Sequence, residues 1–148
     1  MKKLGFGLMR LPLLPGEEKN IDLEHLKDMV DYFIEEGFTY FDTAWFYHKE
    51  QSEVAIGKAL VDRYPRDAYT LADKMPIALL NPEGKSPEEK EEELEDYFQK
   101  QLKKTGAGFF DYYLLHSLDA KKFAVAKSYR AYEFLLEKKR QGYIKKLG

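Results

Sequence analysis

Four side chains able to donate, hold or orient a proton follow strand-like segments of the chain: Asp42, Tyr47, Lys74 and His116. A free phenol has a pKa of about 10, so it is a poor acid at neutral pH unless its phenolate is stabilised. A nearby ammonium supplies that stabilisation, a carboxylate holds the ammonium in place, and a histidine orients the substrate oxygen. Together these residue types suit a general acid that protonates a carbonyl oxygen while its carbon accepts hydride from a cofactor.

Each of these residues also has a simpler structural explanation. Asp42 could cap a helix or a turn, and Lys74 could be a solvated lysine at the end of a strand. His116 could be a packed histidine, and Tyr47 is one of 11 tyrosines. Their placement argues against coincidence, because Asp42, Lys74 and His116 each end a predicted strand. These three positions are about one strand–helix unit apart.

Alternating short apolar runs and helical patterns predict a repeated strand–helix fold. Asp22 is a good N-cap for a first helix, and Ser86 with Glu89 forms a capping-box pattern before another, which Gly106 ends. We expect helices at residues 20–36, 52–64, 86–105 and 121–140, and strands at residues 4–11, 38–43, 68–74, 111–117 and 143–147.

This alternation predicts right-handed units and a parallel sheet in an α/β fold. An open doubly wound sheet and part of a (β/α)8 TIM barrel both place ligands at the carboxyl ends of the strands. A doubly wound nucleotide binder usually has a glycine-rich loop after its first strand, whereas this chain has Leu8-Met9-Arg10. A complete barrel needs about 250 residues. We therefore expect one partial domain over residues 1–148, the first half of a barrel that stops as strand five begins.

Composition excludes several classes of function. The 148 residues are 44% hydrophobic and 34% charged with a net charge of −2, so they lack the basic surface that binds nucleic acid. Because there is no cysteine, disulfides, thiolate metal sites and cysteine-ligated iron–sulfur clusters are excluded. Neither a membrane-spanning run nor a secretory leader is recognisable, so we expect a cytoplasmic protein with no membrane partner.

The motifs resemble those of a known enzyme family. Phe-Asp-Thr-Ala-x-x-Tyr at residues 41–47, followed by Ser52-Glu53 and Ile56-Gly57-x-Ala-Leu, resembles the aldo-keto reductases. Lys74 and the run 113–116, Tyr-Leu-Leu-His, are similar to the second and third signatures of that family. The opening residues 5–12 resemble a bacterial branch that often carries a carboxyl-terminal ferredoxin-like segment, which is not present here.

This resemblance implies an oxidoreductase that reduces small aldehydes or ketones to alcohols with NADPH. It implies that Tyr47 donates the proton, Lys74 makes it a stronger acid, Asp42 anchors Lys74 and His116 orients the carbonyl. The nicotinamide lies at the strand ends in the family, so Gly7, Met9 and Asp42 would border it. The physiological substrate and the choice between NADP and NAD stay open.

Family members are complete barrels, and their later strands carry the residue that stacks on the nicotinamide and the loops that grip the cofactor. The resemblance therefore implies an amino-terminal fragment that binds NADPH poorly and shows little or no activity as a monomer. Whether such a truncation is natural stays open.

Two alternatives remain. The chain could be a non-catalytic half-barrel, and its open strand edges could pair two copies into a homodimer. It could also be a metal-dependent hydrolase on the same fold, but such sites gather several histidines and carboxylates. Here only His116 ends a strand and His48 follows Tyr47 in a loop, so we expect no metal site.

Overall fold

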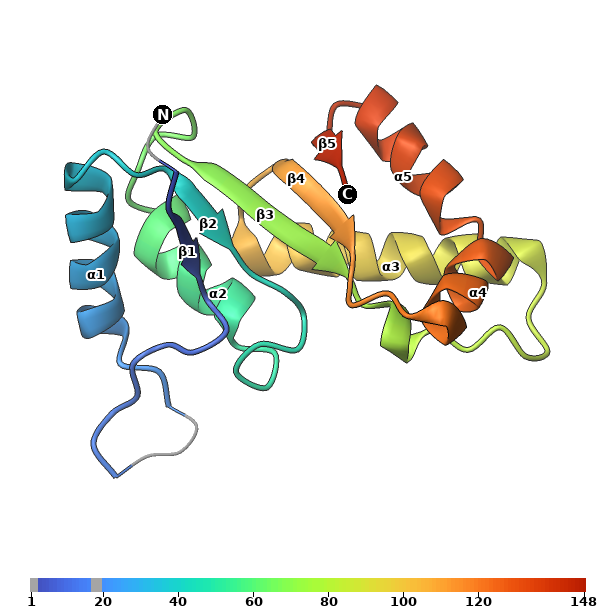
Figure 1. The fold of residues 1–148 in the computed structure, drawn as a ribbon, viewed down its shortest axis with the longest axis horizontal. Helices are drawn as coiled ribbons and strands as arrows, with labels where there is room; N and C mark the ends of the chain where they lie inside the picture. Colours follow the sequence, from blue (N-terminus) through green and yellow to red (C-terminus); the bar gives the residue numbers. More distant parts are fainter. Residues whose placement is uncertain (1–2, 17–19) are drawn as a thin grey trace.

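The fold is a five-stranded parallel sheet in a computed structural model that describes residues 3–16 and 20–148 (Figure 1). The strands lie side by side in sequence order: β1 Gly5–Gly7, β2 Tyr40–Asp42, β3 Thr70–Met75, β4 Phe110–Leu115 and β5 Ile144–Leu147. A doubly wound sheet reverses its strand order at the ligand site, whereas a barrel keeps sequence order. The predicted parallel strand–helix alternation is confirmed.

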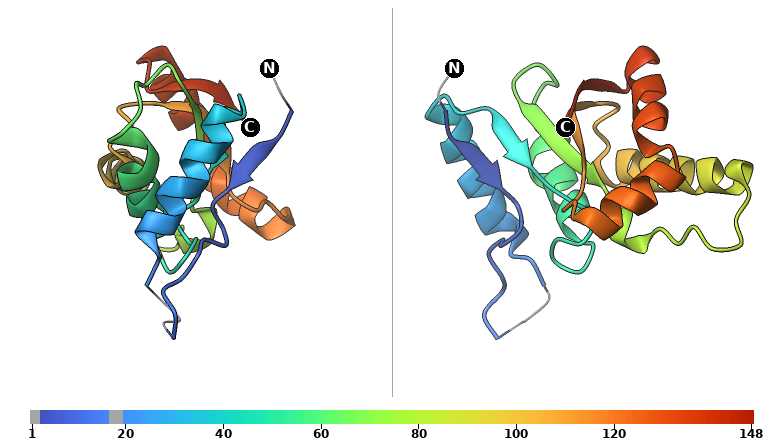
Figure 2. Two further views of the ribbon diagram at one scale, coloured as in Figure 1. Left: turned by 90° about the vertical axis from the view of Figure 1, so that its left-hand side faces the viewer. Right: turned by 45° about the vertical axis from the view of Figure 1, so that its right-hand side comes forward.

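The connecting segments are mainly helical: α1 Leu23–Glu35, α2 Ser52–Ile56, η1 Gly57–Val61, η2 Ile77–Leu79, α3 Pro87–Thr105, α4 Ala120–Ser128 and α5 Ala131–Arg140. Helix α1 packs against η1, α2 against α3, and α5 against β5. Figure 2 shows α2 and α3 next to each other on the same side of the sheet. None of the helices in the described ranges has both the length and the apolar character needed to span a membrane.

Local side-chain chemistry starts two of the helices as predicted. The Asp22 carboxylate accepts a hydrogen bond from the His25 N–H at 3.0 Å. At the start of α3 the Glu89 N–H donates to the Ser86 hydroxyl (3.2 Å) and the Ser86 N–H donates to Glu89 (2.7 Å). Gly106 ends α3 with a φ of 68°. The predicted N-caps and the predicted end of α3 are confirmed.

The strands differ from the predicted ranges at their ends. The first was expected at residues 4–11, but β1 ends at Gly7 because the chain then turns, with Leu13 bridging to Ile21. β3 continues one residue past Lys74, since the Met75 carbonyl accepts from the His116 N–H at 3.1 Å. β2 is shorter than predicted at both ends, β5 begins one residue later than predicted, and β4 begins one residue earlier and ends two residues earlier.

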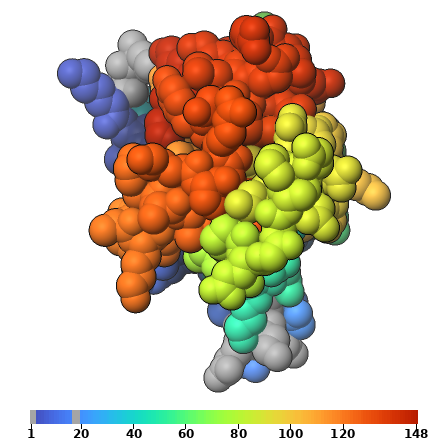
Figure 3. Space-filling view, turned by 90° about the vertical axis from the view of Figure 1, so that its right-hand side faces the viewer, coloured from blue at the N-terminus to red at the C-terminus, as the bar shows by residue number. Residues whose placement is uncertain are grey.

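The single helix expected over residues 121–140 is wrong. Arg130 has a φ of 50°, which breaks the segment into α4 and α5. Beside the break, the buried Tyr129 hydroxyl donates to the Asn81 carbonyl at 2.8 Å. After the break, Tyr132 in the first turn of α5 is 58% exposed. Figure 3 shows α4 and α5 together on one face of the molecule.

The helix expected over residues 52–64 is also interrupted. After Ile56 the chain continues as a π-helical turn, in which the Asp62 N–H donates to the Gly57 carbonyl at 2.9 Å. Gly57 lies against the end of α3, where an added Cβ would come within 2.9 Å of the Thr105 carbonyl oxygen. Only glycine therefore allows these two backbones to approach so closely.

The core lies between the sheet and the helices. Aromatic residues fill both halves of the core. Phe41 of β2 packs against Phe33 of α1, and Tyr113 of β4 packs against Phe98 of α3. Side chains alternate along a strand, so β3 buries Leu71, Asp73 and Met75 toward the helices while Lys74 faces the other side. This alternation decides which residues reach the opposite face of the sheet.

Candidate active site

The predicted site residues come from the carboxyl ends of β2, β3 and β4. In β2 the buried Phe41 faces the core, which leaves the neighbouring Asp42 on the opposite face. Asp42 pairs in register with Ala72, so Lys74 lies two residues further along β3. His116 directly follows β4, where its N–H bonds to β3. Parallel strands thus bring the three side chains to one edge of the sheet.

Lys74 is the centre of the cluster. Its ammonium Nζ lies 2.5 Å from Asp42 Oδ1, 2.6 Å from the Thr43 carbonyl oxygen and 3.4 Å from the Tyr47 hydroxyl oxygen. The Lys74 side chain is only 11% exposed, and that of Asp42 is 27% exposed. The structure therefore joins Asp42 and Tyr47 through one partly buried ammonium.

Tyr47 lies in the loop between β2 and α2, which has an unusual backbone. The next three residues, His48, Lys49 and Glu50, have φ angles of 48°, 53° and 70°. Left-handed conformations cost about 1–2 kcal/mol each for residues other than glycine. Such strain persists only where surrounding contacts impose it, and it is common at functional sites.

Hydrogen bonds to the segment after β1 hold this loop. The Thr43 and Ser52 hydroxyls are 2.9 Å apart, and Ser52 donates to the Leu8 carbonyl at 3.1 Å. His48 Nε2 accepts from the Leu11 N–H at 2.5 Å, and burial lowers the pKa of His48. His48 thus fastens the loop with its ring nitrogen.

His116 lies against Tyr47, with ring centroids 5.9 Å apart and ring planes 84° to each other. Its Nδ1 atom is buried and has no hydrogen-bond partner among the described residues. Burial, and then the charge of Lys74, lowers the pKa of His116 below its ordinary value of 6.5. The imidazole is therefore neutral at physiological pH and has one N–H to donate.

Tyr40 belongs to the same cluster, although the sequence reasoning did not select it. Its hydroxyl donates to Asp42 Oδ2 at 3.4 Å. Burial, then the charge of Asp42, raises the pKa of Tyr40 to about 12, so it stays a phenol. The signal was available in the sequence, because residues two apart on a strand share a face.

The residues predicted to border a cofactor lie at the same edge. Gly7 pairs in register with Asp42, and an added Cβ at Gly7 would meet no atom within 4 Å. Met9 is 57% exposed. The backbone at Gly7 is therefore open to a flat group, although the cofactor role of these residues stays a prediction. In the described ranges no three His, Cys, Asp or Glu side chains are grouped as metal ligands.

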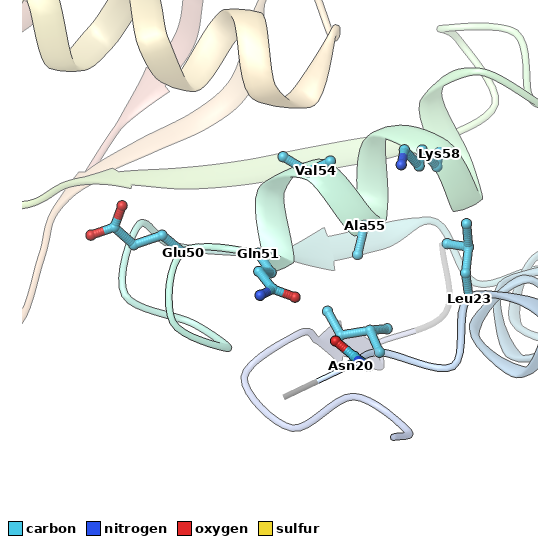
Figure 4. Close-up of a pocket in the computed structure, with 8 residues that line it drawn as sticks. Asn20, Leu23, Glu50, Gln51, Val54, Ala55 and Lys58 are labelled. Atoms are coloured by element: carbon cyan, nitrogen blue, oxygen red, sulfur yellow. The ribbon is translucent and has the colours of Figure 1, made fainter. Parts of the chain in front are cut away.

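A separate pocket of about 350 Å³ lies between α2 and the segment before α1 (Figure 4). Val54, Ala55 and Lys58 line one side, and Asn20 and Leu23 line the other. Its lining contains none of the predicted catalytic residues Asp42, Tyr47, Lys74 and His116, so it is not the predicted site.

The fold matches solved aldo-keto reductases. A thermostable aldo-keto reductase in complex with epalrestat is 22% identical with a TM-score of 0.68, and the match covers 100% of this chain and 48% of that one. The Klebsiella pneumoniae enzyme in complex with NADPH is 20% identical with a TM-score of 0.68, covering 97% and 43%. An enzyme from a Medee basin deep-sea metagenome library is 23% identical with a TM-score of 0.63, covering 100% and 45%.

This chain thus spans about half the length of these structures. The predicted fold class, a parallel α/β arrangement corresponding to half of a barrel, is confirmed. No curated protein matches the chain. The sequence model of the aldo/keto reductase family, however, matches residues 3–148. The chain therefore belongs to the aldo/keto reductase family.

Proposed function

We propose that the cluster of Asp42, Tyr47, Lys74 and His116 delivers a proton in the NADPH-dependent reduction of small aldehydes or ketones to alcohols. One observation carries the proposal: the Lys74 ammonium contacts the Asp42 carboxylate and the Tyr47 hydroxyl at the same time. Aldo/keto reductase family membership supports the reaction class.

Each residue has a role that follows from its contacts. Tyr47 donates its hydroxyl proton to the carbonyl oxygen, and the Lys74 ammonium stabilises the phenolate that remains. Asp42 and the Thr43 carbonyl hold the ammonium in place. His116, neutral beside Lys74, donates its N–H to the substrate oxygen and orients it.

NADPH would supply the hydride that the carbonyl carbon accepts. Gly7, Met9 and Asp42 fit the nicotinamide end, because Gly7 leaves its backbone open beside Asp42. Supporting this cofactor, the Klebsiella pneumoniae relative was crystallised with NADPH. Since the match covers 43% of that enzyme, we infer that these 148 residues alone bind NADPH weakly and turn over slowly.

The proposal can be tested by comparing Tyr47→Phe and Lys74→Met with the wild-type chain. NADPH oxidation at high protein concentration, with a reactive aromatic aldehyde, should fall at least about 100-fold in both variants. Tyr132→Phe, on the exposed face of α5, is the matched control and should keep the wild-type rate. A Tyr47→Phe chain as active as the wild type would refute the role of Tyr47. A fluorescence titration with NADPH separates weak binding from slow chemistry.

A second candidate function is self-association of the half-barrel as an interaction unit. In the sheet formed by the described residues, β1 pairs only with β2 and β5 only with β4. Each outer strand thus keeps one edge that a second copy could pair with. Sedimentation analysis showing a monomer at high concentration would exclude this candidate, whereas a dimer that dilution dissociates would support it.

A further inference from the structure

A buried polar network lies behind Lys74, on the helix side of the sheet. Its four side chains come from four elements and are all 0% exposed: Glu53 of α2, Asp73 of β3, Gln101 of α3 and Tyr113 of β4. Charged and amide groups are rarely buried so fully unless partners satisfy them. The proposed mechanism uses none of these side chains.

Gln101 connects the network to Lys74. Its Nε2 atom lies 2.7 Å from Glu53 Oε1, 2.9 Å from Asp73 Oδ1 and 3.1 Å from the Lys74 carbonyl oxygen. Its Oε1 atom accepts a hydrogen bond from the Tyr113 hydroxyl. Because one nitrogen atom contacts both carboxyl groups, Glu53 and Asp73 are close neighbours in a place without solvent.

The charges in this network do not balance if both acids are ionised. Lys104 Nζ lies 3.0 Å from Glu53 Oε2 and 3.5 Å from the centre of the Trp45 ring, so Glu53 has its own cation. The Lys74 side chain is on the opposite face of the sheet, where its ammonium forms an ion pair with the Asp42 carboxylate. Asp73 Oδ2 is buried and has no hydrogen-bond partner among the described residues. Neighbouring buried carboxyls cannot both ionise at ordinary cost.

We propose that Asp73 is a neutral carboxylic acid at physiological pH, sharing its proton with Glu53, and that this pair together with Gln101 is a positioning unit for Lys74. The proton sits on Asp73 Oδ2 and donates to the Glu53 carboxylate, which gives the unpartnered oxygen its missing bond. The positioning role rests on the function proposed for Lys74, whereas the protonated carboxyl does not.

The surrounding titratable groups agree with this assignment. Burial, then the charge of Glu53, raises the pKa of Asp73 well above its ordinary value of 3.8. Burial raises the pKa of Tyr113 well above its ordinary value, which keeps it a phenol that donates to Gln101. The other charged groups are Lys104, already paired with Glu53 and 3.9 Å from Glu50, and the ammonium of Lys74 beyond the sheet.

The network fixes both polar groups of the Lys74 backbone. The Lys74 N–H donates to Asp73 Oδ1 at 2.8 Å, and its carbonyl accepts from Gln101. The side chain of Lys74 then reaches the Tyr47 hydroxyl at 3.4 Å, the outer limit of a hydrogen bond. A small displacement of this backbone would therefore break the contact that the proposed proton transfer needs.

Asp73→Asn tests the protonation state, because asparagine is uncharged and has nearly the same shape. A raised pKa means that the folded chain keeps a proton which the unfolded chain releases above about pH 4. The wild-type unfolding constant should therefore rise about tenfold per pH unit relative to that of Asp73→Asn, up to the pKa of folded Asp73. Urea unfolding between about pH 5 and pH 8 measures this ratio.

Asp111→Asn is the matched control. The pKa of Asp111 is lowered, because hydrogen bonds from Leu71, Lys145 and Arg66 outweigh its burial. Asp111 is thus ionised in the folded and the unfolded chain across this range. The ratio of the wild-type unfolding constant to that of Asp111→Asn should therefore not change with pH. A flat ratio for Asp73→Asn would overturn the proposal. Infrared spectra of the wild-type chain give a second reading that needs no variant: a protonated carboxyl band at pH 7, whose absence would also overturn it.

Gln101→Met tests the positioning role, since methionine has a similar size and no N–H. The ¹³Cε resonance of Lys74, assigned with Lys74→Met, should move toward those of the exposed lysines. Gln99→Met, on the exposed face of α3, should leave it in place. An unchanged Lys74 resonance in a folded Gln101→Met chain would overturn the positioning role. Neither measurement uses NADPH or a carbonyl, so their failure is distinct from failure of the proposed reaction.

Discussion

The Lys74–Asp42 ion pair can be compared with a second pair of the same length in this chain. Lys74 Nζ lies 2.5 Å from Asp42 Oδ1, and Lys100 Nζ lies 2.5 Å from Asp96 Oδ2. The side chains of the first pair are 11% and 27% exposed, whereas both side chains of the second are 55% exposed. Water and salt weaken exposed pairs most, so the coupling should follow burial rather than distance.

A double-mutant cycle with Asp42→Asn and Lys74→Met measures the coupling free energy of the partly buried pair. Exposed pairs couple by about 0–1 kcal/mol, and charged residues in one buried network couple by up to about 3 kcal/mol. An intermediate burial predicts about 2 kcal/mol, or about a 30-fold change in the unfolding constant. Urea unfolding followed by circular dichroism at pH 7 gives the four unfolding free energies that the cycle needs.

The control cycle uses Asp96→Asn and Lys100→Met. Its coupling should be several-fold smaller than that of the first cycle, and about 1 M salt should abolish it. The coupling between Asp42 and Lys74 should largely survive the same salt. Equal coupling in the two cycles would refute the reasoning, because distance alone would then decide the strength of the pair.

Three further predictions concern the loop, the sheet and the histidine. Lys49→Gly should stabilise the chain by about 1 kcal/mol in urea unfolding, because Lys49 has a φ of 53° that glycine adopts without strain. Ala124→Gly, at an exposed position in the middle of α4, should instead destabilise it by about 1 kcal/mol; stabilisation by both would contradict the argument. Asp111 has a lowered pKa, so its contribution to stability is present above its ordinary value of 3.8 and is lost as the pH falls below it. Asp111→Asn should therefore lose less stability than the wild type during acid titration below pH 3.8, and parallel titration curves would contradict this. Finally, Lys74→Met should raise the pKa of His116, followed by NMR of its ring, because the ammonium helps to lower it; an unchanged or lower pKa would show that Lys74 has no such effect.

Signals that lie within one element were readable from the sequence. Ser86 and Glu89 mark the start of α3 because capping needs only residues three apart. The strand ends were also informative, since a parallel sheet brings its carboxyl ends to one edge whatever the exact bounds. That is why Asp42, Lys74 and His116 meet although β3 and β4 end elsewhere than predicted. The catalytic roles of these residues stay predictions.

Helix breaks that depend on contacts with distant residues could not be predicted from the sequence. Apolar residues continue at helical spacing through residues 121–140, so the sequence favours one helix. The break at Arg130 follows Tyr129, whose hydroxyl bonds to the Asn81 carbonyl 48 residues away. Nothing in the local pattern near Tyr129 indicates that partner.

The buried network was hidden for the same reason. Gln101 lies in α3 among many charged residues, where a glutamine usually faces solvent. Its partners Glu53 and Asp73 are 48 and 28 residues away in other elements. Periodicity describes the faces of one helix or strand, and it cannot show which polar groups meet across elements.

The close approach at Gly57 has a consequence for variants of this chain. Glu53 lies one helical turn before Gly57, and Gln101 lies one turn before Thr105, whose carbonyl oxygen an added Cβ would approach within 2.9 Å. A single methyl group at residue 57 would thus push apart the helices that carry Glu53 and Gln101. Ranking substitutions by their distance from Tyr47 would miss this position. Residue 57 affects Lys74 indirectly, because it sets the distance between the two helices that carry Glu53 and Gln101.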